Sequence, residues 1–244
     1  MPDTAERIRD NILFTQERIA RAAERAGRAP QDVSLMAVTK FNPAESVVAA
    51  YRAGIRLFGE NRVQEALSKY VPLRQEIPAA ALHMIGTLQK NKINKALSLF
   101  DGIQSIDSAE TLEAILARAD QRSSPLQLFM ELHTGEESKA GFPNVDDLLR
   151  ACEIVAEFHQ SNPRARDSIA LRGLMTMAPF TSDIAAVRRS FAALAEASRA
   201  VAQHFGFPDF NQLSMGMSND FEIAIEEGST IVRVGTALFG ERSA

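Results

Sequence analysis

The sequence has a single cysteine, Cys152, among its 244 residues, which excludes an internal disulfide and fits a reducing compartment. It also lacks a surplus of basic residues, and a formal net charge of −4 at pH 7 argues against binding to nucleic acid, which requires a concentrated positive surface. No apolar run is long enough to span a bilayer, and the N-terminus has the pattern of an amphipathic helix and not of a secretory signal. We therefore expect a cytoplasmic protein that binds neither nucleic acid nor a membrane.

Short apolar runs alternate with amphipathic helical stretches along the chain. Eight of these runs are predicted to be strands: 34–40, 55–60, 82–86, 102–107, 126–133, 169–177, 212–217 and 231–235. Eight β/α units at this length predict an α/β fold, a single (β/α)8 TIM-type barrel, with an open doubly wound sheet as the alternative. We expect residues 1–244 to form one domain, in which residues 1–30 are an added helix packed on the barrel.

Functional groups of such a barrel lie at the carboxyl ends of its strands, and the first strand ends in Lys40. An amine that is partly deprived of water is more readily neutral, and a neutral amine attacks carbonyl compounds to form a Schiff base. The alternative is a lysine that extends into solvent from the strand end. The strand alone leaves both interpretations open.

The loops after the last two strands carry small and hydroxyl residues where barrels often bind phosphate. Ser214, Gly216 and Ser218 surround the end of the seventh strand, and Gly235-Thr236 ends the eighth. Each is a weak signal alone, because Ser-Gly turns are common and usually structural. Together, at the two expected places, they predict a phosphate-binding cup.

Strand alternation in the eighth strand puts Ile231, Arg233 and Gly235 on one face and the intervening residues on the other. If the Arg233 face lines the barrel, its guanidinium needs a partner or a bound acceptor to offset the loss of water. The partner could be a ligand. The alternative is a structural ion pair with a barrel glutamate such as Glu60 or Glu131.

A Schiff-base lysine on the first strand, a phosphate cup and an inward arginine resemble the pyridoxal-phosphate barrel of alanine racemase, that is, its N-terminal domain. Longer blocks are similar to one branch, the pyridoxal phosphate homeostasis protein family. These blocks are LMAVTK at 35–40, FGENRVQE at 58–65, HMIGTLQKNK at 83–92, GEESKAG at 135–141, RGLM at 172–175 and SMGMSNDFEIAIEEGSTIVRVGTALFG at 214–240.

The resemblance implies that pyridoxal 5′-phosphate (PLP) is the cofactor and that Lys40 holds it as an internal aldimine. It also implies that Ser214 and the amides of Gly235 and Thr236 hold the phosphate, and that Arg233 faces the pyridine nitrogen. The remaining residues that the resemblance assigns to the pocket are Asn61, Met215 and Ser218.

The family implies a role in intracellular PLP (vitamin B6) homeostasis, with possible delivery of PLP to apo-enzymes, and not catalytic turnover. A guanidinium leaves the pyridine nitrogen unprotonated, so the ring is a poorer electron sink for racemisation. The chain also ends shortly after the eighth strand, so we expect it to lack the racemase β domain and to be a monomer. A PLP-dependent racemase-like enzyme and a cofactor-free Schiff-base aldolase are the alternatives.

Several other residues are assigned no role in this scheme. Tyr51 and Tyr70 are predicted to pack in helices, and the histidines and Cys152 show no metal-ligand spacing. Lys92 and Lys139 lie in loops after predicted strands and are left as solvated lysines or as auxiliary groups for PLP transfer.

Overall fold

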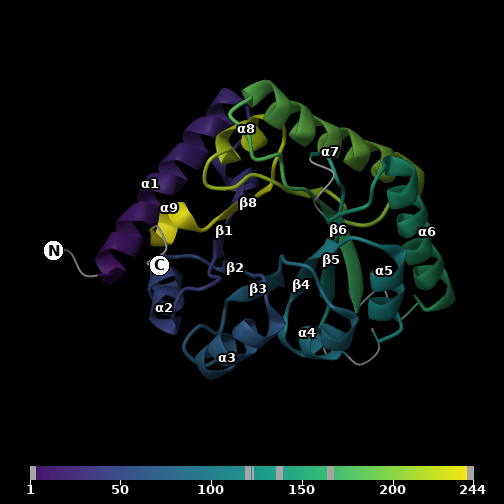
Figure 1. Ribbon diagram of the computed structural model, residues 1–244, viewed down its shortest axis with the longest axis horizontal. Coiled ribbons are helices and arrows are strands. Elements are labelled where there is room, and N and C mark those ends of the chain that lie inside the picture. The colour runs from purple at the N-terminus through teal and green to yellow at the C-terminus, as the bar shows by residue number, and fades with distance from the viewer. Residues whose placement is uncertain (1–3, 119–121, 123, 136–139, 164–167, 241–244) are drawn as a thin grey trace.

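The computed structural model describes residues 4–118, 122, 124–135, 140–163 and 168–240. Eight parallel strands close into a barrel in the order β1 to β8, with each strand beside its neighbours in sequence and β8 paired back to β1 (Figure 1). The predicted (β/α)8 barrel is therefore confirmed, and the open-sheet alternative is wrong. The strands are β1 (Ser34–Val38), β2 (Leu57–Glu60), β3 (Ala81–Met84), β4 (Gly102–Ile106), β5 (Leu126–Glu131), β6 (Ile169–Met175), β7 (Gln212–Ser214) and β8 (Ile231–Val234).

Helices surround the barrel on the outside, as the crossover connections of a parallel sheet require (Figure 1). They are α1 (Thr4–Arg25), α2 (Ala44–Arg52), α3 (Val63–Leu73), α4 (Ile93–Leu99), α5 (Ala109–Leu116), α6 (Val145–Ser161), α7 (Ile184–Phe205), α8 (Phe221–Glu226) and α9 (Thr236–Phe239), with short 3-10 turns η1 (Pro30–Asp32) and η2 (Lys90–Lys92). Asn144 caps α6 by accepting a hydrogen bond from the Asp147 amide at 2.9 Å, which explains why that helix begins at Val145.

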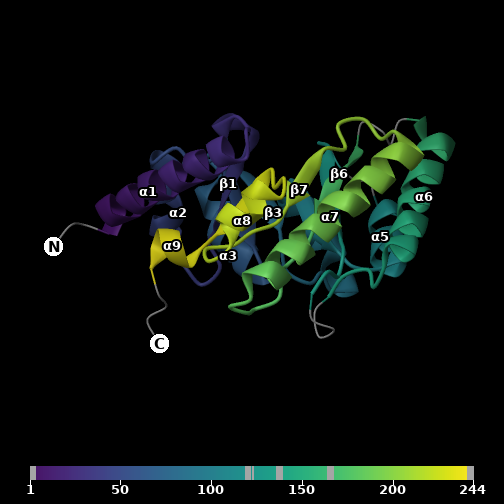
Figure 2. The ribbon, with the colours of Figure 1, turned by 90° about the horizontal axis from the view of Figure 1, so that it is seen from above.

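The first helix, α1, lies outside the β/α repeat and packs against α2, α8 and α9 (Figures 1 and 2). Its buried face includes Ile8, Ile12 and Ile19, which follow the helical spacing of the sequence. Asn11 also donates a hydrogen bond to the Leu238 carbonyl at 3.0 Å. The N-terminal helix therefore covers the end of the barrel wall where β8 returns to β1.

Alternating strand residues separate two cores. Outward residues such as Phe58, Val232 and Val234 pack against the helices, whereas Met36, Phe129, Met175 and Ile231 form a separate buried cluster inside the barrel. The predicted alternation in β8 is thus confirmed. In β1 the same alternation gives the inward face to Met36, Val38 and Lys40, and the outward face to Ala37 and Thr39.

The carboxyl ends of several predicted strands extend one to three residues too far, because the last residues already belong to the functional loops. β1 ends at Val38, two residues before Lys40, and β7 ends at Ser214.

Within the described part of the chain, none of the helices is long and apolar enough to cross a membrane.

Candidate functional site

A cavity of about 280 Å³ opens at the carboxyl ends of the strands. Its lining residues come from loops after β1, β2, β3, β6, β7 and β8, as expected for the working face of a barrel. Six of the eight predicted site residues meet there: Lys40, Asn61, Ser218, Arg233, Gly235 and Thr236. Residues 177–180 and Ile85 complete much of the apolar side of the wall, which the sequence did not indicate.

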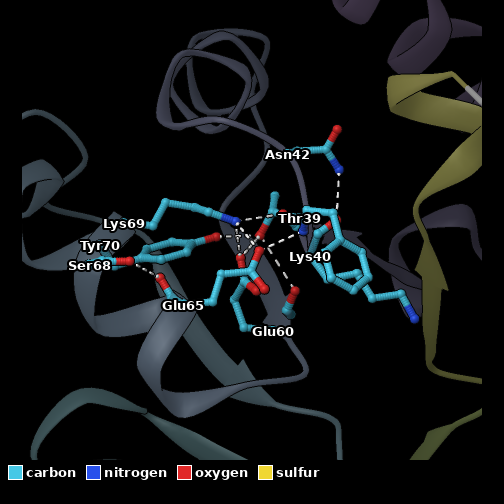
Figure 3. A network of polar contacts seen from close by, with 10 residues as sticks. Thr39, Lys40, Asn42, Glu60, Glu65, Ser68, Lys69 and Tyr70 are labelled. Atoms are coloured by element: carbon cyan, nitrogen blue, oxygen red, sulfur yellow. Dashed lines mark hydrogen bonds and ion pairs between the residues drawn. The ribbon is translucent and has the colours of Figure 1, made fainter. Parts of the chain in front are cut away.

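Lys40 lies two residues after the end of β1, on the inward-facing side of that strand, and lines the cavity. Its side chain points away from a group of acidic residues and toward the segment at the end of β8 (Figure 3). Asn42 donates a hydrogen bond from Nδ2 to the Lys40 carbonyl at 3.1 Å, which closes the turn. The next residue, Phe41, has a left-handed backbone with φ of 63°, an uncommon conformation for a residue with a side chain.

Behind the Lys40 loop lies the Lys69 cluster, which consists of Thr39, Glu60, Glu65, Lys69 and Tyr70 (Figure 3). The Lys69 ammonium contacts Glu60 Oε1 at 2.8 Å, Glu65 Oε1 at 3.0 Å and the Thr39 carbonyl at 2.7 Å. The Thr39 hydroxyl contacts Glu60 Oε1 at 2.8 Å and the Tyr70 hydroxyl at 2.7 Å. The end of β1 is therefore tied to β2 and α3 by charged groups.

Glu60 is fully buried on the outward face of β2, and burial raises its pKa although Lys69 and Thr39 oppose that shift. Its Oε2 atom has no hydrogen-bond partner among the described residues. The sequence offered Glu60 as an ion-pair partner for Arg233, and this is wrong. Strand alternation directs the Glu60 side chain out of the barrel toward α3, whereas Arg233 points inward.

Arg233 lies inside the barrel, 5% exposed, and reaches the cavity. Its NH1 donates to the Ser214 carbonyl at 2.6 Å and the Ser214 hydroxyl at 2.8 Å, and NH2 donates to the Thr176 carbonyl at 2.8 Å. Burial lowers the pKa of Arg233 to about 10, against the opposing charges of Glu131 and Asp220. The guanidinium therefore stays charged at neutral pH and is held by neutral oxygen atoms.

Glu131, the other proposed partner, is the last residue of β5, and the Arg233 guanidinium contacts Ser214 and Thr176 and forms no ion pair with Glu131 in the described residues. Burial raises its pKa to about 7, with the Asp107 charge adding to the rise and the Arg233 charge reducing it. The predicted ion pair between Arg233 and Glu131 is thus wrong, because the two groups are not in direct contact. The charge of Glu131 still acts on Arg233 over a longer distance.

The Arg233 contacts continue across the barrel as the Gln104 chain, which consists of His83, Gln104, Ser214 and Arg233. The Ser214 hydroxyl donates to Gln104 Oε1 at 2.6 Å, and Gln104 Nε2 lies 3.0 Å from His83 Nδ1. Burial lowers the pKa of His83 to about 4, so its ring is neutral and can accept at Nδ1. The sequence gave no indication of this chain, because its members come from four separate strands.

Ser214 and Met215 are the two predicted site residues that the structure does not bring to the cavity surface. Ser214 is the last residue of β7, fully buried inside the barrel one layer below the cavity and bonded to Gln104 and Arg233. Met215 follows on the outward face and packs in the core against the helices. The hydroxyl that reaches the cavity from this loop belongs to Ser218.

The loops after β7 and β8 come together at one side of the cavity. The Ala237 amide lies 3.4 Å from the Ser218 hydroxyl, and the Arg233 amide donates to the Gly216 carbonyl at 2.9 Å. Gly216 has φ of +94°, and a Cβ there would stand 2.6 Å from that of Ala224, so the turn requires glycine. A Cβ on Gly235 would lie 3.3 Å from the Val38 carbonyl, which shows how closely β8 approaches β1 beside the cavity.

The other predicted residues lie away from this centre. Tyr70 is buried as predicted, but its hydroxyl also joins the Lys69 cluster. Lys92 is at the end of η2 and does not line the cavity, and Lys139 lies outside the described residues.

The chain matches the family model of the alanine racemase N-terminal domain over residues 15–243. It is 37% identical to the pyridoxal phosphate homeostasis protein of Vibrio cholerae, with 96% of each chain covered. It is 35% identical to the protein of the same name from Escherichia coli, with 96% of this chain and 97% of the relative covered.

Solved structures agree with this relationship. PipY of Synechococcus elongatus with PLP bound has a TM-score of 0.77 and 35% identity, over 91% of this chain and all 100% of PipY. Alanine racemase from E. faecalis has a TM-score of 0.67 at 20% identity, and 59% of its length is covered, so it shows the shared fold alone. The chain therefore belongs to the pyridoxal phosphate homeostasis protein family, whose barrel is that of the alanine racemase N-terminal domain.

Proposed function

We propose that the protein binds PLP reversibly on Lys40 and serves in intracellular PLP homeostasis. One observation carries the proposal: Lys40, the Arg233 guanidinium and the Gly235-Thr236 turn all open into the same cavity. This combination offers an amine, a fixed positive charge and a small-residue turn within reach of one small molecule. PipY, a relative of similar length, has been solved with PLP bound.

The residues fit this ligand in size and in chemistry. About 280 Å³ is near the lower end of the ~300–1,000 Å³ range of small-molecule pockets, which suits a single-ring compound. PLP supplies an aldehyde that can condense with an amine, and Lys40 is the only lysine that lines this cavity among the described residues. Apolar side chains such as Ile85 and Met177 offer surfaces for the flat ring.

We assign a role to each remaining residue from its position in or beside the cavity. We assign the phosphate to the Ser218 hydroxyl and the backbone amides of Gly235 and Thr236, and place Asn61 on the opposite wall. Arg233 faces the ring nitrogen, and because a guanidinium has only donors, it keeps that nitrogen unprotonated. Ser214, to which the family resemblance assigned the phosphate, instead holds Arg233 through its carbonyl and hydroxyl oxygens.

We propose a carrier and not a catalyst. Racemisation needs a proton donor and acceptor on opposite faces of the reacting carbon. In the described part of the chain, the titratable residues that line the cavity are Lys40, Asp220 and Arg233, and Asp220 already accepts a hydrogen bond from the Met217 amide. The proposal includes a monomer of one domain in the cytoplasm that delivers PLP to apo-enzymes.

The test is the visible absorbance spectrum of the purified protein with added PLP, followed by borohydride reduction and peptide mapping. We expect a yellow band that reduction fixes onto Lys40, that Lys40→Ala abolishes and that Lys92→Ala leaves intact. No band in the native protein, or a band that survives in Lys40→Ala, would contradict the assignment. Turnover of D- or L-alanine by the loaded protein would replace the carrier with the racemase alternative.

A further inference from the structure

The Lys69 ammonium is saturated with contacts although it does not line the cavity. An ammonium has three protons, and this one faces three acceptors: the Thr39 carbonyl at 2.7 Å, Glu60 Oε1 at 2.8 Å and Glu65 Oε1 at 3.0 Å. Its side chain is 8% exposed. Such a group has a fixed position, because any rotation would leave a buried charge without a partner.

One of these acceptors is the main chain directly before Lys40. The Thr39 carbonyl belongs to the peptide group that joins Thr39 to Lys40, and it accepts a hydrogen bond from Lys69 of α3. The peptide group on the other side, which joins Lys40 to Phe41, is held by the same cluster. Its amide, on Phe41, donates to Glu65 Oε1 at 2.5 Å.

The backbone at Phe41 explains why such contacts are needed. A left-handed conformation costs a residue with a Cβ about 1–2 kcal/mol, and φ at Phe41 is 63°. The Phe41 side chain is 56% exposed, so burial of the ring does not hold this conformation. Glu65 binds the amide of the strained residue, and the Arg62 guanidinium lies over the Phe41 ring at 5.6 Å. Strain that is held by surrounding contacts is typical of functional loops.

We propose that Lys69 and Glu65, with Glu60 as the anion that fixes Lys69, are positioning residues for Lys40. They hold both peptide groups that flank Lys40, and so they set the direction in which its side chain leaves the backbone and enters the cavity. The inference rests on the proposed role of Lys40 as the residue that captures PLP. It goes beyond that role because it places on α3, outside the cavity, residues on which the capture of PLP by Lys40 depends.

The chemistry that depends on this positioning is the attack of the Lys40 amine on the PLP aldehyde. The amine nitrogen forms a bond to the aldehyde carbon, and the aldehyde oxygen leaves as water once the nitrogen has lost its protons. The step needs no other reactant. Misplacement of an attacking group by a fraction of an ångström lowers the rate of such a step without changing how the rest of the ligand is bound.

The experiment compares two ligands on the same variants. PLP reports covalent capture through its absorbance change, whereas pyridoxine 5′-phosphate carries an alcohol in place of the aldehyde and reports only non-covalent binding. The variants are Lys69→Met, Glu65→Leu and the conservative Lys69→Arg. Arg52→Met is the matched control, because it removes an exposed ion pair from Arg52 to Glu76 at 2.8 Å that shares no residue with the Lys69 cluster.

We expect the rate of PLP capture to fall about tenfold in Lys69→Met and in Glu65→Leu, while the affinity for pyridoxine 5′-phosphate stays within about twofold. Lys69→Arg restores part of the rate, and Arg52→Met does not change it. If Lys69→Met does not fold, Glu65→Leu decides the question, since Glu65 is less buried.

Two results overturn the inference. One is an unchanged capture rate in folded Lys69→Met or Glu65→Leu protein, and the other is an equal loss of binding for both ligands, which would indicate a merely structural role. A native protein that binds PLP without covalent capture would instead overturn the proposed function of Lys40 itself. The two failures are thereby distinguished.

Discussion

The two polar networks beside the cavity, the Lys69 cluster and the Gln104 chain, are built from different kinds of groups. The Lys69 cluster is built from full charges, with two carboxylates around one ammonium, and it lies between the barrel wall and α3. The Gln104 chain is built from neutral groups that end on one guanidinium, and it crosses the barrel interior. The first holds the main chain around Lys40, and the second holds the side chain of Arg233.

The difference shows how the local surroundings determine the kind of group that is used. A strained loop such as that at Phe41 needs strong acceptors and donors to hold it, and charge-assisted hydrogen bonds are about twice as strong as neutral ones. Inside the barrel, a second full charge next to Arg233 would pay a large desolvation cost, so amide, hydroxyl and carbonyl groups share the contact. The charged network should therefore be the more sensitive one to removal of a single group.

The largest expected effect is on the stability of the charged network. Lys69→Met leaves Glu60 and Glu65 without their cation, and breaking a buried ion pair in this way costs about 3–5 kcal/mol of unfolding free energy. The measurement is chemical denaturation followed by circular dichroism. The double variant Glu60→Leu with Lys69→Met should recover much of the loss, because it removes the stranded charge as well. A single variant as stable as the native protein would show that the cluster is not a tight ion pair in solution.

The next effect separates two of the inward titratable groups, His83 and Glu131, whose contributions to stability respond to pH in opposite directions. The His83 pKa is lowered to about 4, so its contribution to stability is lost as pH falls from 6.5 through 4. The Glu131 pKa is raised to about 7, so its contribution is lost as pH rises from 4.5 through 7. Each pKa shift corresponds to about 3 kcal/mol of unfolding free energy once the group has titrated completely.

Relative to the native protein, His83→Gln should therefore gain stability as the solution is acidified, and Glu131→Gln should gain stability as it is made alkaline. Denaturation at pH 4.5, 5.5, 6.5 and 7.5 measures both slopes. Equal pH profiles for the two variants would contradict the assigned protonation states.

A smaller effect is expected from the middle of the neutral chain. Gln104→Leu removes the partners of His83 Nδ1 and the Ser214 hydroxyl but leaves two carbonyl contacts of Arg233 in place. Because neutral hydrogen bonds contribute less, we expect a loss of about 2 kcal/mol of unfolding free energy. Denaturation again provides the measurement, with Gln127→Leu as the control, because Gln127 is a glutamine of β5 that does not belong to the Gln104 chain. A loss as large as that of Lys69→Met would remove the distinction between the networks.

The sequence predicts the residue that each network holds in place, Arg233 or Lys40, and misses most of the residues that do the holding. The inward direction of Arg233 follows from alternation in β8, and Lys40 follows from its place at the end of β1. Gln104 and His83 carry no local signal, because they are ordinary polar residues until closure of the barrel brings β3, β4, β7 and β8 together. The fold is predictable because each β/α unit is a local pattern, whereas the contacts inside the barrel depend on all eight strands at once.

Ser214 shows the same limit at one residue. The sequence places it at the end of β7, next to the loop that lines the cavity, but a shift of a few residues in the predicted strand end decides whether a hydroxyl faces the cavity or the barrel interior. The phosphate cup was predicted from the place of hydroxyl and glycine residues after the seventh and eighth strands, and the family resemblance chose Ser214; neither ground shows whether Ser214 or Ser218 faces the cavity. The helix α3 likewise gives no hint that Lys69 and Glu65 face the loop after β1 and not solvent.

The smallest effect tests which contacts of the charged network matter for Lys40. Tyr70→Phe removes only the hydroxyl that contacts Thr39 Oγ1 at 2.7 Å and keeps the edge-on packing of the ring against Phe58. We expect a loss of about 1 kcal/mol in unfolding free energy. PLP capture should stay within about twofold of native, because Lys69 and Glu65 still hold the peptide groups on both sides of Lys40. A capture rate that falls as far as in Glu65→Leu would mean that the hydroxyl contacts of Thr39, and not the main-chain contacts, position the lysine, and stopped-flow absorbance on the two variants side by side decides between them.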